Sequence, residues 1–61
     1  MNIYRLTAFE KNGEKILDES FEAADEAEAK EIGEKILKEK GALEKTHRCV
    51  TSKGQLLLFH P

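Results

Sequence analysis

Hydrophobic and polar residues alternate near the start of the chain in two runs, residues 3–9 and residues 15–22. Alternation with a period of two is typical of β-strands, because successive side chains point to opposite faces. The dipeptide Asn12-Gly13 lies between the runs and favours a tight type I′ turn. The pattern predicts a β-hairpin, closed either by this turn or by a three-residue loop with Gly13 in the left-handed conformation.

The turn decides which residues lie opposite each other in this hairpin. With the two-residue turn, Leu17 lies opposite Ala8 and Phe21 lies opposite Tyr4. The three-residue loop changes the pairing by one residue. Both turns are compatible with the sequence.

A helix is predicted over residues 26–40, where the hydrophobic period becomes 3.6. Asp25 and Glu28 form a capping box at its start, and Gly41 ends it. Gly33 lies on the apolar stripe, where glycine costs roughly 1 kcal/mol relative to alanine. We therefore expect close contact between helix and sheet at Gly33. The stripe consists of Ala29, Ile32, Gly33, Ile36 and Leu37.

Two further strands are predicted at residues 45–51 and 55–60. Residues 52–54 suit a three-residue loop with Gly54 in the left-handed conformation. In that register His60 lies opposite Thr46, whereas a two-residue turn at residues 53–54 would place His60 opposite His47. The other pairs of the three-residue register are Val50 with Leu56, Cys49 with Leu57, and His47 with Phe59.

The order ββαββ predicts an α+β fold, a single domain over residues 1–61. Two hairpins joined by one helix should form a four-stranded, mostly antiparallel sheet with the helix packed on one face. A single helix covers only one face, yet the strands place apolar residues on both. Exposed apolar patches usually mark interaction sites, so the uncovered face is the place to look for function.

Composition excludes several functional classes. The 61 residues include 12 acidic and 10 basic ones, a net charge of −2, which lacks the basic excess of a dedicated duplex-DNA binder. No apolar run approaches the ~20 residues of a membrane span, and the first residues lack a signal-peptide pattern. With one cysteine there is no internal disulfide, whereas small domains in oxidising compartments usually have several. We expect a cytoplasmic protein with a reduced thiol.

His47, Cys49 and His60 are the residues to weigh as metal ligands or as a nucleophile and its base. A tetrahedral metal site needs four ligands, and there is no second cysteine. Cys49 with His47 is a possible nucleophile and base, but nothing supplies a third orienting group or an oxyanion hole. We expect no catalytic site, no metal site and no cofactor, with Cys49 packed as a small hydrophobic residue.

The leading hypothesis is a non-catalytic interaction module that self-associates or binds another protein through the uncovered face. A charge at Ile16 should then abolish association and leave the helix intact. The alternative is a single-stranded nucleic-acid binder, in which bases stack on aromatic residues beside cationic ones. Arg5 could instead pair with an acid across the strands, Glu19 or Asp18. The predicted interaction residues are Ile3, Phe9, Ile16, Leu57 and Phe59, and the nucleic-acid set is Arg5, Phe9, Lys45, Arg48 and Lys53.

Several segments together resemble the YhzD-like family of short, uncharacterised bacterial proteins. They are YRLT (4–7), LDESFEA (17–23), EAKEIG (28–33), THRCV (46–50) and GQLLLFH (54–60). The resemblance covers the whole chain. It implies a bacterial cytoplasmic setting, and it implies no known activity and no catalytic or binding residues.

Overall fold

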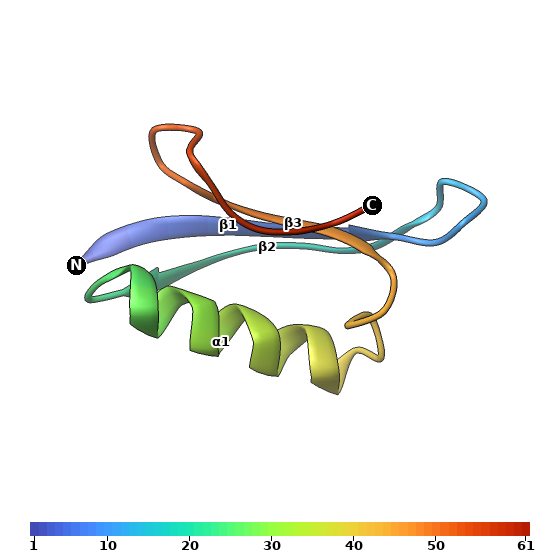
Figure 1. Cartoon of the computed structure of the whole chain (residues 1–61), viewed down its shortest axis with the longest axis horizontal. Helices are drawn as coiled ribbons and strands as arrows, with labels where there is room; N and C mark the ends of the chain where they lie inside the picture. The colour runs from blue at the N-terminus through green and yellow to red at the C-terminus, as the bar shows by residue number, and fades with distance from the viewer.

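A computed structural model of residues 1–61 contains five elements in the order ββαββ. The strands form one antiparallel sheet with the order β2-β1-β3-β4, and the helix lies across one face (Figure 1). The α+β fold expected from the sequence is confirmed, and every element ends within one residue of its predicted bounds. The elements are β1 (Asn2–Phe9), β2 (Lys15–Ala23), α1 (Glu26–Glu39), β3 (Thr46–Thr51) and β4 (Leu56–His60).

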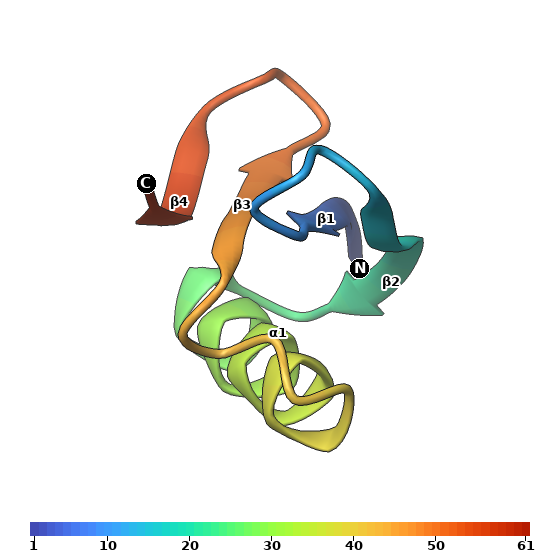
Figure 2. The ribbon, with the colours of Figure 1, turned by 90° about the vertical axis from the view of Figure 1, so that its right-hand side faces the viewer.

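The sheet is built from two hairpins that meet through their first strands. β1 pairs with β3 along the centre, so β2 and β4 form the two edges (Figure 2). Because β1 and β3 are antiparallel, the two hairpin loops project from opposite ends of the sheet (Figure 1). The helix lies between the hairpins in the chain, and its 14 residues bring the chain back for the second hairpin.

The core lies between α1 and the sheet face that it covers. Tyr4, Leu6 and Ala8 of β1 are buried there, as the alternation of this strand predicts. Tyr4 stacks on Phe21 of β2, with 5.8 Å between the ring centres. The completely or nearly buried apolar residues are Tyr4, Leu6, Ala8, Leu17, Ala23, Ala29, Leu37, Ala42 and Cys49.

Gly33 brings α1 close to the sheet, as predicted. A Cβ atom built on Gly33 would lie 3.2 Å from Cδ1 of Leu58 and 3.9 Å from both Sγ of Cys49 and Cζ of Phe21. The absence of a side chain at this position therefore sets the distance between helix and sheet.

Side chains and backbone groups satisfy both ends of α1. Asp25 is the N-cap, and its Oδ1 accepts a hydrogen bond from the Glu28 amide at 2.8 Å. Glu28 in turn accepts from the Ala24 amide at 2.9 Å, one residue before the N-cap amide of the usual capping box. At the other end the Ala42 amide donates to the Leu37 carbonyl at 2.8 Å, the hydrogen bond of a Schellman motif.

Both hairpins are closed by three-residue loops with a left-handed glycine. Gly13 has φ +87° and Gly54 has φ +84°, and no other residue type has a positive φ. A type I′ turn at Asn12-Gly13 is excluded, because it requires a positive φ at Asn12 as well. In each loop the glycine amide donates to the carbonyl three residues earlier, at 2.9 Å. The three-residue alternatives are therefore confirmed for both hairpins.

A β-bulge follows each loop and corrects the register by one residue. Phe9 pairs with Lys15 but Ala8 pairs with Leu17, so Ile16 has no partner. The predicted Tyr4–Phe21 and Ala8–Leu17 pairs thus form despite the longer loop. The bulges lie at equivalent positions: Ala8, Gly13 and Leu17 correspond to Cys49, Gly54 and Leu58 at a constant offset of 41 residues.

The bulge in the second hairpin makes part of the predicted register wrong. Val50 pairs with Leu56 as expected, but Leu57 has no partner. Cys49 therefore pairs with Leu58 rather than Leu57, and His47 pairs with His60 rather than Phe59. The physical reason is that the extra residue of β4 shifts every later pair by one.

Candidate interaction surface on the open sheet face

The sheet face that points away from α1, here called the open face, has a charged half and an apolar half. Directly paired residues share a face, so the open-face side chains follow from the register. Rows run across the sheet from β2 to β4: Ser20, Arg5, Val50 and Leu56 form one row, and Asp18, Thr7, Arg48 and Phe59 form the next.

An ion-pair network occupies the half over β1 and β2. The Arg5 guanidinium binds Asp18 in a bidentate manner, with Nε to Oδ1 at 3.0 Å and Nη2 to Oδ2 at 2.9 Å. Lys15 Nζ donates to the same Oδ2 at 3.1 Å. The hydrogen bond from Arg5, followed by that from Lys15, lowers the pKa of Asp18. The predicted pairing of Arg5 with a cross-strand acid is confirmed, with Asp18 as the partner.

Four hydrophobic side chains, here called the apolar patch, lie mainly on the half over β3 and β4. Phe59 is 54% exposed and Leu56 is 49% exposed, although both are large apolar residues in a strand. Val50 lies beside Leu56 and Phe9 closes the end of the patch, both half-buried. The patch consists of Phe9, Val50, Leu56 and Phe59.

A hollow of about 300 Å³ lies within this half, between the two phenylalanines. Phe9, Phe59 and Arg48 line it together with Thr7, Thr46 and His47. Arg48 is exposed and has no acidic group within ion-pair distance. The hollow thus combines two aromatic rings with an unpaired guanidinium.

The structure brings together only part of the predicted interaction set. Phe9 and Phe59 line the same hollow, whereas Ile3 is exposed on the same face opposite Glu22, one row beyond Arg5 and Val50, and does not line the hollow. Ile16 and Leu57 are the two bulged residues, and both pack against the buried core rather than alternating onto the open face. Val50 and Leu56 lie on the open face, where Ile16 and Leu57 were expected.

The predicted basic set is also divided. Lys45 forms an ion pair with Glu10 at 3.0 Å, and Arg5 is held by Asp18. Lys53 lies in the β3–β4 loop, beside Asn2 and Ile3 at the far end of the sheet. Among the predicted basic residues, Arg48 alone stands beside Phe9.

The thiol of Cys49 is fully buried, as predicted for a small hydrophobic residue. Burial raises the pKa of the Cys49 thiol, which disfavours the nucleophilic thiolate. His47 makes its protein hydrogen bond to the Lys45 carbonyl and not to this thiol. No group of three or more metal-ligating side chains occurs in the chain.

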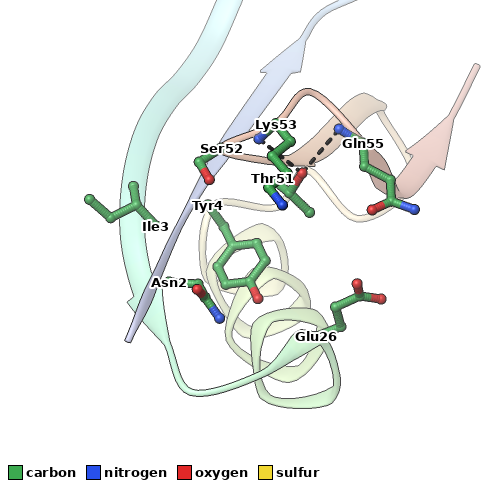
Figure 3. Close-up of a pocket in the computed structure, with 8 residues that line it drawn as sticks. All are labelled: Asn2, Ile3, Tyr4, Glu26, Thr51, Ser52, Lys53 and Gln55. Carbon is green, nitrogen blue, oxygen red and sulfur yellow. Dashed lines mark hydrogen bonds between the residues drawn. The ribbon is translucent and has the colours of Figure 1, made fainter.

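A second hollow, of about 170 Å³, lies at the end of the sheet near the start of α1. Figure 3 shows Tyr4 extending toward the helix, with Glu26 on one side and the β3–β4 loop on the other. Thr51 Oγ1 accepts hydrogen bonds from the Lys53 amide at 3.2 Å and the Gln55 amide at 3.0 Å. The hydroxyl of Thr51 thus holds the β3–β4 loop in place. The residues that line this second hollow offer few apolar contacts for a ligand.

The amino-acid sequence is similar to a family model and to a bacterial protein. The model of the YhzD-like protein family matches residues 1–61. The chain belongs to the YhzD-like family. The uncharacterized protein YhzD of Bacillus subtilis (strain 168) is 47% identical over 57 residues, which cover 93% of each chain. The resemblance noted in the sequence is therefore confirmed.

The remaining comparisons give no functional assignment for this YhzD-like chain. No solved structure matches it. Its helix is too short and too polar to cross a lipid bilayer. The open face therefore supplies the functional argument.

Proposed function

We propose that the chain is a non-catalytic module of the bacterial cytoplasm that associates with a second copy of itself through the apolar patch. The observation that carries the proposal is that Phe59 and Leu56 are each about half exposed, on a sheet face that no element covers. Burying apolar surface stabilises by roughly 25 cal/mol per Å², and association is one way in which a small domain gains stability. A cytoplasmic setting suits a chain whose single cysteine is buried and unpaired.

A second copy suits this surface because its four apolar side chains can be buried against the same four of the partner. The ion pairs of Arg5, Lys15 and Asp18 lie over β1 and β2, outside the patch, whereas the unpaired Arg48 lies beside it. Residues 10–34 have a net charge of −7 and residues 38–53 have a net charge of +3. This asymmetry favours arrangements that bring the acidic part of one copy near the basic part of the other.

The test is the molar mass in solution over a wide range of concentration. We expect twice 6.9 kDa for the natural chain and a monomer for Phe59→Glu, with the helical circular dichroism unchanged. Ser20→Glu is the matched control, because Ser20 is exposed on the same face but outside the patch. Ile16 is unsuitable for this test, since a charge there would enter the core. A monomer at every concentration, or a Phe59→Glu dimer, contradicts the proposal.

The second candidate function is binding of single-stranded nucleic acid in the 300 Å³ hollow. The unpaired Arg48 beside Phe9 and Phe59 favours it, because aromatic rings stack bases and a guanidinium pairs with phosphate. Asp18 in the same row opposes it electrostatically.

This candidate predicts salt-sensitive binding of a short oligouridine. Arg48→Glu should weaken binding at low salt, whereas Lys30→Glu on the exposed side of α1 should leave it nearly unchanged. NMR titration is the measurement, and the resonances of Phe9 and Phe59 should shift. If no resonance moves at low ionic strength, nucleic-acid binding is excluded.

A further inference from the structure

Two histidine rings stand side by side at the end of the second hairpin. His47 of β3 pairs directly with His60 of β4, and their ring centres are 5.6 Å apart with 32° between the planes. The bulge at Leu57 creates this pair, because without it His60 would lie opposite Thr46. The chain has no other histidine.

In the neutral form of each ring, a hydrogen bond to a main-chain oxygen decides which nitrogen carries the proton. His47 Nδ1 lies 3.0 Å from the Lys45 carbonyl oxygen, and His60 Nδ1 lies 3.0 Å from the Pro61 main-chain oxygen. A carbonyl oxygen only accepts hydrogen bonds, so each Nδ1 carries the proton. Each Nε2 therefore has a free lone pair. Ligating histidines are commonly oriented in this way, with the other ring nitrogen donating to an oxygen.

Both Nε2 atoms are accessible to solvent. Neither ring makes a protein hydrogen bond through Nε2, and no buried side-chain nitrogen or oxygen of the protein lacks a partner. It follows that Nε2 of His47 reaches the surface although this residue is only 8% exposed. Two imidazole lone pairs are thus accessible to solvent on neighbouring strands, β3 and the edge strand β4.

We propose that His47 and His60 form a two-imidazole binding site for a borderline divalent cation such as Zn²⁺. Zn–N bonds of about 2.0–2.1 Å place ring centres roughly 5.2 Å apart when two imidazoles share one tetrahedral ion. The 5.6 Å separation is close to this value. Imidazole is a preferred ligand of zinc, copper and nickel.

The site has two protein ligands and leaves the remaining positions to water. No third histidine, cysteine, aspartate or glutamate side chain stands close enough to complete it. Cys49 is two residues from His47 on the same strand, but it is fully buried opposite Leu58. The expected ion is therefore exchangeable, held at the surface rather than enclosed in the core.

The experiment is a titration of the metal-free chain with Zn²⁺ at neutral pH, followed by NMR of the imidazole ring signals. We expect one equivalent to shift the signals of both rings together. His60→Ala should weaken binding by at least about tenfold, because a single imidazole replaces a chelating pair. Thr46→Ala is the matched control, since Thr46 is an exposed neighbour without a ligating group. Lowering the pH should release the ion, because protons compete for the neutral imidazole.

If a variant fails to fold, the titration of the natural chain alone tests whether His47 and His60 bind zinc. Zinc that shifts the signals of both rings supports the site. If zinc leaves the NMR signals of either ring unchanged, the proposed site is wrong. The same holds if zinc shifts only the signals of the glutamates in α1. Equal affinity of the folded His60→Ala variant and the natural chain overturns it as well.

Discussion

Gly33 is a residue of α1 at which the helix packs closely against the sheet. The position was predictable from sequence, because a glycine on a buried helical stripe is costly unless something packs against it. Its main neighbour, Leu58, was not predictable. Leu58 takes this place only because the bulge at Leu57 shifts the register of β4.

Replacing Gly33 with alanine should stabilise the protein slightly. Alanine gains roughly 1 kcal/mol of helix propensity, and part of this is lost because Leu58 Cδ1 must move by a few tenths of an ångström. Leu58 can move, since it is half-buried on an edge strand and the contact is the end of its side chain. Urea denaturation should show a gain of about 0.5 kcal/mol, the difference between these two effects.

Gly33→Val is the contrasting variant. Its two methyl groups would also meet Phe21, so it should destabilise the chain. A destabilised Gly33→Ala variant would show that the β4 side of the core cannot adjust.

At the scale of elements, the start of α1 depends on one side chain. Asp25 accepts the Glu28 amide at 2.8 Å, and it has an extended backbone with φ −153° and ψ 179°. Asp25→Ala should lower the free energy of unfolding by about 0.5–2 kcal/mol, because a helical amide loses its partner. Asp25→Asn should retain most of the stability. Thermal or urea unfolding checks both, and equal stabilities of the alanine and asparagine variants would show that the cap contributes nothing.

The strands and the helix were predictable, whereas the bulges were not. Both hairpins were predicted from alternation and from their glycine loops. These patterns do not reveal whether a strand contains an extra residue without a partner. A signal was nevertheless present. Ile16-Leu17 and Leu57-Leu58 are adjacent apolar pairs that follow a glycine loop, and a bulge lets both members of such a pair reach the core.

For the whole molecule, the bulges decide the composition of the candidate surface. They place Ile16 and Leu57 against the core, and they leave Val50, Leu56 and Phe59 beside Arg48 on the open face. The existence of an uncovered face was predictable from having one helix and four strands. Its division into a charged half and an apolar half required the register, which places Arg5 and Asp18 within bonding distance.

The strand order has a consequence for how the chain folds. Each hairpin joins residues that are near in sequence, and such hairpins form in about 1–10 μs in isolation. The pairing of β1 with β3 joins Leu6 to Cys49 across both the first hairpin and the helix. Contacts between distant residues slow folding, because the loop must close before they form. We therefore expect the pairing of β1 with β3, which joins the two hairpins into one sheet, to limit the folding rate.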